Sequence, residues 1–343
     1  MKKKFFLMAL LISFTFTSEA FTCNCNTKFC KLFKTFVFKF NNDVIKRRKD
    51  PSSDKRYTNG LTLGYITKDL KENTEITNHF PVIDKLGETI HGSICLNHDI
   101  YTPDEIEDIN ILENQHPYSG ELNLTFGIHG DNNFKLLSHN TPTLLSLSLS
   151  LGTTGKYSYA KNVQTEFHRY TGNDIPLGWD HQLPSHFMGK LSGSVISKFD
   201  PIKFKQTLLE VLVNIGADVG NTLRQGSAGI EFRLGWNLPD DFGTYSLDSG
   251  SFASNIQSKN SPTRNKTRCG LHLILYTRGK YVDYNYHLGE YLSPTREIAE
   301  LGGGFGFSGY GYKMTLMFIN QSEQFEEQNG PHRFGTVMIT YVR

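Results

Sequence analysis

A strict alternation of apolar and polar residues constrains the fold of this chain more than any other feature. The clearest run is Leu145-Ser146-Leu147-Ser148-Leu149-Ser150-Leu151, where every Leu falls on one side and every Ser on the other. Successive side chains of a β-strand point to opposite faces, so this pattern predicts strands whose two faces meet different surroundings. Alternation of this kind predicts twelve strands: Thr35–Asn42, Thr58–Thr67, Thr89–Tyr101, Tyr118–His129, Thr143–Gly152, Gly189–Lys198, Phe204–Asp218, Ser227–Trp236, Cys269–Val282, Glu297–Phe307, Tyr312–Gln321 and Arg333–Val342.

Long two-faced strands fit two folds. A soluble sandwich buries its apolar faces between two sheets, whereas a transmembrane barrel turns the apolar face to lipid and the polar face to a lumen. Short links at Gly130–Asn133, Asp200–Lys203 and Ser308–Gly311 alternate with longer ones for much of the chain, as in outer-membrane barrels. We therefore predict an all-β fold, a twelve-stranded antiparallel transmembrane barrel over residues 35–343, although the chain ends on Arg343 rather than on an aromatic residue.

The first 20 residues have the pattern of a secretion signal. Lys2–Lys4 supply positive charge, Phe5–Phe16 an apolar stretch, and Ser18-Glu19-Ala20 a small-x-small cleavage site. We expect a signal peptide over residues 1–20 and a Cys-bearing leader over residues 21–34. The leader contains Cys23, Cys25 and Cys30, which would suit a disulfide or a metal, and we assign them no role.

Charge and hydropathy exclude two classes of protein. The chain has 36 Lys+Arg against 34 Asp+Glu, a net charge of +2, so no global field points to nucleic acid as a partner. Apart from the N-terminus, no apolar run reaches the roughly 18–20 residues that a membrane-spanning helix needs. We predict a protein embedded in the bacterial outer membrane by its strands.

The longest link of the central strands predicts a structured outer loop. In Thr153–Met188, the residues Ala160, Val163 and Phe167 recur at helical spacing, and Gly172 is a natural stop signal. A short helix should therefore lie against the outer rim of the barrel, packed through this apolar face. His168 falls beside that face rather than on it, so it is expected to point toward the barrel.

Three polar clusters converge on this rim. They are Asn41-Asn42-Asp43 at the end of the first strand, Arg56-Tyr57-Thr58-Asn59-Gly60 at the start of the second, and the outer-loop stretch His168-Arg169-Tyr170-Thr171-Gly172-Asn173-Asp174. Taken singly, each has an ordinary explanation, because Asn-Asp at a strand end is common turn chemistry and a loop histidine is usually solvated.

Together the clusters resemble the calcium-dependent outer-membrane lipid A 3'-O-deacylases, which are twelve-stranded barrels. The matching stretches are Asn42-Asp43, Tyr57-Thr58-x-Gly60 and His168-Arg169-x-x-Gly172-x-Asp174, with Trp179-Asp180-x-Gln182 and Val219-Gly220-Asn221 downstream. The resemblance covers nearly the whole mature chain. One departure is Asp174, which stands where some members have Glu and so shortens the reach to a metal by one methylene.

The resemblance implies a calcium-dependent esterase that removes the 3'-linked acyl (acyloxyacyl) chain from lipid A of lipopolysaccharide. His168 would activate water as a general base, while Asn42 and Thr58 would hold the water or the oxyanion. Calcium prefers oxygen ligands, so Asp43 and Asp174 are expected to share one ion. Arg56, in a basic outer loop, is expected to meet a lipid A phosphate. Whether Thr58 or water is the nucleophile stays open, as does the oligomeric state.

Two other functions fit a barrel of this kind. One is a passive pore or adhesion barrel, in which the polar rim is only a cluster of loops. The other is an outer-membrane phospholipase, for which no His-x-Ser pair with a suitable Asn is evident. No Gly-x-Ser-x-Gly motif is present, so an acyl-enzyme of the common hydrolase type has no support.

Overall fold

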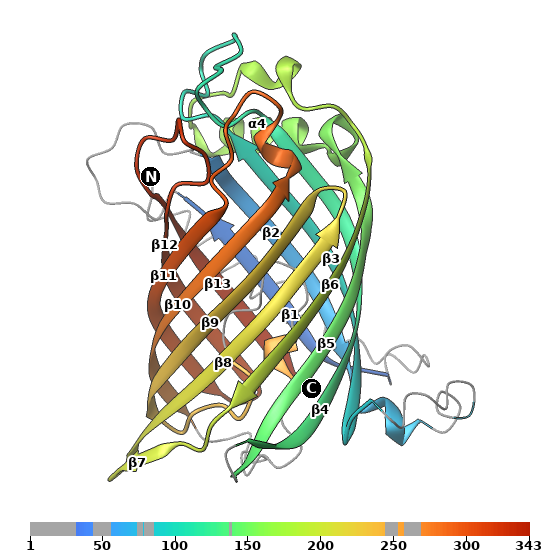
Figure 1. Cartoon of the computed structure of the whole chain (residues 1–343), viewed down its shortest axis with the longest axis vertical. Helices are drawn as coiled ribbons and strands as arrows, with labels where there is room; N and C mark the ends of the chain where they lie inside the picture. The colour runs from blue at the N-terminus through green and yellow to red at the C-terminus, as the bar shows by residue number, and fades with distance from the viewer. Residues whose placement is uncertain are drawn as a thin grey trace.

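One antiparallel sheet closes on itself to form a barrel (Figure 1). The computed structural model describes residues 32–43, 56–73, 78, 86–136, 139–243, 253–256 and 269–343. Its strands are β1 (Phe33–Asn42), β2 (Arg56–Thr67), β3 (Thr89–Thr102), β4 (Ser119–Leu136), β5 (His139–Thr154), β6 (Phe187–Lys198), β7 (Ile202–Phe204), β8 (Thr207–Gly220), β9 (Leu223–Trp236), β10 (Gly270–Asn285), β11 (Glu297–Gly309), β12 (Tyr312–Gln321) and β13 (His332–Val342).

Pairing of β1 with β13 and of β6 with β8 closes the wall. The short strand β7 pairs only with β8, so the wall has twelve strands and the predicted fold is confirmed. Each predicted strand overlaps an observed one. The predicted link at Gly130–Asn133 was wrong, because β4 runs through it to Leu136.

The period-two pattern separates lipid from lumen as expected. On β5, Leu147 and Leu149 are 51% and 43% exposed on the outer face, whereas Ser148 and Ser150 are buried inside. Among the described residues, no helix is long and apolar enough to cross a bilayer. The signal peptide and Cys23, Cys25 and Cys30 lie outside the described residues. Cys95 is buried and Cys269 is exposed.

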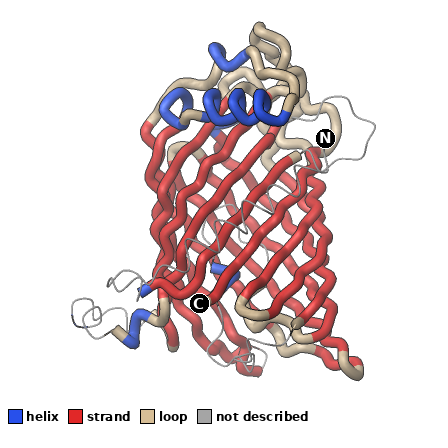
Figure 2. The backbone as a smooth tube through the Cα atoms, turned by 180° about the vertical axis from the view of Figure 1, so that it is seen from behind, coloured by secondary structure: helices blue, strands red, loops and turns tan. Residues whose placement is uncertain are grey.

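Helical segments gather mainly at one end of the barrel. Helix α4 (Ala160–Thr171) lies across the upper end in Figure 2, whereas the C-terminus lies toward the opposite end (Figure 1). Gly172 ends α4 with a positive φ of 69°, as the sequence predicted. The short 3-10 helices are Leu70–Glu72, Gly155–Ser158, Gly178–His181, Ala253–Asn255 and Tyr286–Leu288.

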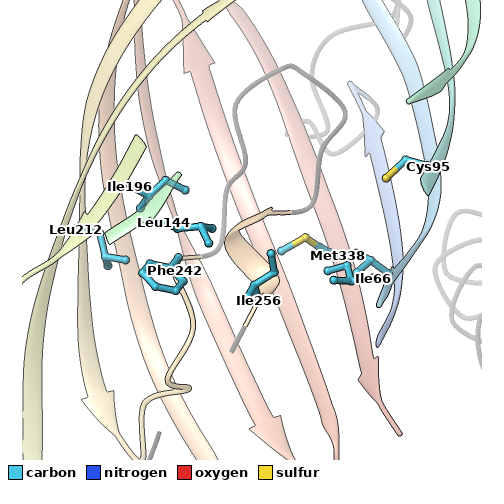
Figure 3. Close-up of a cluster of buried hydrophobic side chains, with 9 residues drawn as sticks. Ile66, Cys95, Leu144, Ile196, Leu212, Phe242, Ile256 and Met338 are labelled. Atoms are coloured by element: carbon cyan, nitrogen blue, oxygen red, sulfur yellow. The ribbon is translucent and has the colours of Figure 1, made fainter. Parts of the chain in front are cut away.

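The connection between β9 and β10 enters the lumen. Phe242 and Ile256 from this connection pack against apolar side chains that line the inside of the wall (Figure 3). These inward side chains include Val37, Ile66, Leu144, Ile196, Leu212 and Met338. We call the described parts of this connection, Leu238–Gly243 and Ala253–Ile256, the lumen plug.

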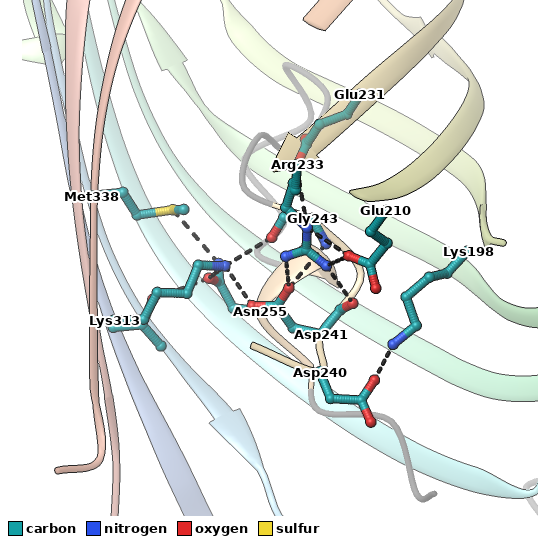
Figure 4. A network of polar contacts seen from close by, with 11 residues as sticks. Lys198, Glu210, Glu231, Arg233, Asp240, Asp241, Gly243, Asn255, Lys313 and Met338 are labelled. Atoms are coloured by element: carbon teal, nitrogen blue, oxygen red, sulfur yellow. Dashed lines mark hydrogen bonds and ion pairs between the residues drawn. The ribbon is translucent and has the colours of Figure 1, made fainter. Parts of the chain in front are cut away.

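Polar and charged contacts attach the lumen plug to three strands of the wall, β9, β12 and β13 (Figure 4). Asp241 accepts hydrogen bonds from Arg233 on β9 at 2.6 Å and from Lys313 on β12 at 2.5 Å. Asn255 accepts from Lys313 at 3.3 Å and from Thr340 on β13 at 3.0 Å. Buried charges are tolerated only when they are paired, so this network holds the plug in place.

Candidate active site

A β-bulge decides the direction of Thr58. Thr62 lines a lumen cavity of about 140 Å³, so strict alternation along β2 would also turn Thr58 inward. The pairing of β2 with β3 shifts between Tyr57 and Asn59, which makes Thr58 an extra residue in the ladder. As a result, Tyr57 lines the cavity, and the Thr58 hydroxyl lies 2.6 Å from the hydroxyl of Thr102.

Thr102 and Asn42 belong to the outer face of the wall. Asn41 on β1 and Tyr101 on β3 line the lumen cavity, so the residue after each points outward. The Asn42 side chain donates a hydrogen bond of 3.1 Å to the Thr58 carbonyl. Asp43 follows directly, and its side chain is completely buried. The predicted residues Asn42 and Thr58 therefore lie buried on the outer face of a wall that is otherwise largely apolar, and the buried Asp43 follows Asn42 in the chain.

The segment that leads into α4 is seated on the outer face of β3 and β4. A Cβ added at Gly120 would lie 2.3 Å from the Ala160 Cβ and 2.3 Å from the Ser158 hydroxyl, so only glycine permits this contact. The Ser158 carbonyl also meets His98 Nε2 at 3.0 Å. Trp179 is fully buried in the same outer loop.

The side of α4 that is buried against the barrel differs from the predicted one. It consists of Ala160, Gln164 and His168, whereas Val163 is 45% exposed and Phe167 half-buried. Of the expected apolar packing face only Ala160 is fully buried, so that prediction was largely wrong, and His168 lies on the buried side of the helix. Gln164 finds a polar partner in this position, because its side-chain oxygen accepts a 2.8 Å hydrogen bond from the indole of Trp179.

His168 is held in one orientation by the turn that follows it. Gly172 reverses the chain, and the His168 Nδ1 is hydrogen-bonded to the backbone carbonyl of Asp174. A carbonyl only accepts, so Nδ1 carries the proton and the lone pair lies on Nε2. The Asp174 side chain is exposed. In this structure Asp174 therefore orients His168 through its backbone, and its role as a metal ligand stays a prediction.

The guanidinium of Arg56 makes hydrogen bonds and an ion pair within the protein. Its nitrogens donate to the carbonyls of Asn329 and Gly330, each at 3.1 Å, and lie 3.5 Å from the Asp104 carboxylate. The side chain is only 5% exposed. Arg56 thus joins the outer loops after β3 and β12, and a role in phosphate binding stays a prediction.

An aromatic stack joins β3 to two connecting segments outside the strands. Tyr101 lies between His116 and His287, with ring centroids 5.3 and 4.4 Å away. His287 reaches the Ser119 hydroxyl at 2.7 Å and the Glu121 carboxylate at 3.0 Å. Burial lowers the pKa of His116 in the β3–β4 loop to about 3. These contacts tie the outer loops to the inside of the wall.

Thr102 and Gln164 were not among the predicted site residues. Thr102 contacts Thr58, and Gln164 lies on the buried side of α4. The predicted strand Thr89–Tyr101 stopped one residue before Thr102, and the Thr102 hydroxyl meets Thr58 only because of the bulge. Gln164 lies one helical turn before His168, and that spacing was the only available signal.

Comparison with known proteins identifies relatives of the whole chain. The family model described as outer membrane protein LpxR matches residues 5–343. The solved structure of LpxR from Salmonella typhimurium has a TM-score of 0.71 at 16% identity, covering 90% of this chain and 100% of that one. The β domain of the Bordetella autotransporter BrkA has a TM-score of 0.42 at 9% identity, covering 90% and 99%. No curated protein matches the sequence.

Proposed function

This chain belongs to the outer membrane protein LpxR family, and on that premise we propose that it hydrolyses the 3'-linked acyl chain of lipid A in the outer membrane. The observation that carries the proposal is the pair of buried polar residues Asn42 and Thr58 on the lipid-facing side of the wall, with the buried Asp43 next to Asn42 in the chain. Lipid A keeps its acyl chains in the hydrocarbon and its sugars at the surface. An ester at that boundary lies at the level of the rim, so the location supports this substrate.

The proposed reaction uses His168 as a general base. Its Nε2 takes a proton from a water molecule whose oxygen attacks the ester carbonyl carbon. The bond from that carbon to the 3' oxygen of the sugar then breaks, and His168 returns the proton to this leaving oxygen. The products are the free fatty acid and lipid A with a 3' hydroxyl. The Thr58 hydroxyl is engaged with Thr102 at 2.6 Å, which supports water as the nucleophile.

The side chains of Asn42 and Thr58 suit the charge that develops on the ester. Neutral hydrogen-bonding groups held in place before the reaction stabilise an oxyanion without reorganisation. The hydrogen bond from Asn42 to the Thr58 carbonyl fixes the two residues relative to each other. We assign them the task of orienting the water and the ester carbonyl.

The oxygen groups at this site are compatible with calcium. Asn42, Asp43 and Thr58 offer amide, carboxylate and hydroxyl oxygens, which are the hard ligands that calcium prefers. When bound, calcium would polarise the ester carbonyl. Among the described residues, no three or more His, Cys, Asp or Glu side chains are grouped so that they could hold a metal ion. With so few protein charges, we expect weak binding, of the order of 10⁻⁴–10⁻³ M.

The test is deacylation of lipid A by the purified protein in detergent micelles, followed by mass spectrometry. We expect a product lacking the 3' acyl chain in calcium, no product in excess chelator, and recovery when calcium is restored. Asp43→Ala should raise the calcium requirement more than Asp174→Ala, because only Asp43 is buried at the wall. Unchanged lipid A in calcium would refute the proposed activity, and full activity in chelator would refute the metal role alone.

The alternative functions find less support. A passive pore requires an open lumen, but the lumen plug occupies this one. A phospholipase would need a serine and histidine exposed to lipid. The stretch His91-Gly92-Ser93 lies on β3, where Ser93 is bonded to His129 at 2.8 Å. His91, Ser93 and His129 are all buried inside the wall.

A further inference from the structure

The residues that precede Asn42 and Thr58 are joined on the opposite side of the wall. Asn41 donates a 2.8 Å hydrogen bond to the Tyr57 hydroxyl, and this hydroxyl donates one of 2.8 Å to Asp99. On the outer face, Asn42 donates to the Thr58 carbonyl at 3.1 Å. The wall at the site is therefore cross-linked on both faces, by adjacent residues of the same two strands.

A bulge needs such support. The extra residue interrupts the backbone hydrogen bonds between β2 and β3. Side-chain contacts are therefore needed to stabilise the backbone conformation at the bulge. The Tyr57 ring packs edge-on against Phe334, with centroids 5.6 Å apart, and at 5.4 Å from Tyr101. Its hydroxyl uses both a donor and an acceptor function. Tyr57 is thus held firmly immediately before the bulged Thr58.

Gly60 provides the space for this arrangement. A Cβ at Gly60 would lie 1.8 Å from the Tyr57 hydroxyl and 2.8 Å from the Asp99 carboxylate. The Tyr57 side chain therefore lies directly over Gly60 on the lumen face. This contact gives a physical reason for the Tyr57-Thr58-x-Gly60 spacing in the sequence.

We propose that Tyr57 is a positioning residue that acts on the site from the lumen. Bonded to Asn41 and Asp99, it holds the bulge in the conformation that turns Thr58 outward beside Asn42. It does not touch the substrate, because the wall lies between them. This inference rests on the proposed deacylase activity and adds a determinant of its rate.

The test compares Tyr57→Phe with Tyr276→Phe. Tyr276 is a matched control, since it is also buried in the lumen, bonds a carboxylate (Glu300) at 3.4 Å, and lies over a glycine, Gly302. Small misplacements of reacting groups cost up to about 100-fold in rate. We expect Tyr57→Phe to lower kcat roughly 10–100-fold with little change in KM, and Tyr276→Phe to leave both near wild type.

Four further variants separate positioning from general stability. Asp99→Asn retains an oxygen acceptor for the Tyr57 hydroxyl and should keep most of the rate, whereas Asp99→Leu should match Tyr57→Phe. Gly60→Ala should lower kcat by displacing Tyr57, while Gly302→Ala, which makes the same clash with Tyr276, should not. The heat-modifiable migration of each variant reports whether the barrel has folded.

The outcomes distinguish this inference from the proposed function. An active wild type with a folded Tyr57→Phe variant of equal kcat would overturn the positioning role and leave the deacylase intact. An equal loss of kcat in Tyr57→Phe and Tyr276→Phe would also overturn it, since the loss would then follow from removing any buried tyrosine hydroxyl in the lumen. A wild-type protein without deacylase activity would refute the proposed function itself.

Discussion

At the residue scale, the hydrogen bond from His168 to the Asp174 carbonyl leaves Nε2 as the basic nitrogen. We predict that His168→Ala lowers the deacylation rate about 10²–10⁴-fold, the usual cost of losing a general base. The barrel should still fold, because the wall does not depend on this side chain. His181 is the matched control in the same loop, exposed and without an assigned role. A loss in His181→Ala with full activity in His168→Ala would show that the wrong histidine was chosen.

A second residue, His116, leads us to predict that the stability of the β3–β4 loop depends on pH. Burial lowers its pKa to about 3, against about 6.5 in an unfolded chain. We call the β3–β4 loop closed when His116 is buried and open when His116 is exposed to water. Between pH 3 and pH 6.5, His116 binds a proton in the open loop but not in the closed loop. The stability of the closed loop is therefore complete above pH 6.5 and falls as the pH drops toward 3, by up to about 1.4 kcal/mol per pH unit.

Hydrogen exchange of the β3–β4 loop, corrected for intrinsic rates, checks this prediction. Protection should be lower at pH 5 than at pH 7.5. His116→Phe keeps an aromatic ring beside Tyr101 and cannot titrate, so its protection should not depend on pH. A wild-type loop with equal protection at both values would contradict the assignment.

At the element scale, the position of α4 depends on one missing side chain. Gly120→Val would drive a side chain into Ala160 and Ser158, which already lie 2.3 Å from an added Cβ. We predict that the helix is displaced with His168 on it, lowering the deacylation rate about 100-fold while the strands keep their pairing. Gly226→Val is the control, because nothing lies within 4 Å of a Cβ there. Both variants are compared by activity and by heat-modifiable migration.

The same elements show what the sequence could and could not predict. The twelve strands were predictable because Leu147 and Ser148 meet lipid and lumen, two surroundings that impose a period of two. The seating of α4 was not, because Gln164 and His168 bury a polar face against the barrel, and pattern reasoning assigns burial to apolar faces. The outward direction of Thr58 depends on the bulge, which exists only once β2 is paired with β3.

At the scale of the whole molecule, the lumen plug packs against the inside of the barrel wall. We predict that the wild-type protein conducts no measurable ion current in planar bilayers. Asp241→Ala should leave Arg233 and Lys313 buried without their shared carboxylate, a change that typically costs about 3–5 kcal/mol. The plug should then be displaced and current should appear.

Asp180→Ala is the control for this experiment. It removes the exposed ion pair between Lys161 and Asp180 in the outer loop and should change nothing measurable. Current through the wild-type barrel would contradict the sealing role of the plug. A folded Asp241→Ala variant that conducts no ion current would contradict it as well.

The outward placement of Asn42 and Thr58 has a consequence for kinetics. A site on the lipid-facing side of the wall meets its substrate by lateral diffusion within one leaflet, and the product leaves the same way. The quantity that governs encounter is then the mole fraction of lipid A in the surrounding film rather than its concentration in the bulk. Added inert detergent should slow turnover at constant total substrate, the behaviour known as surface dilution.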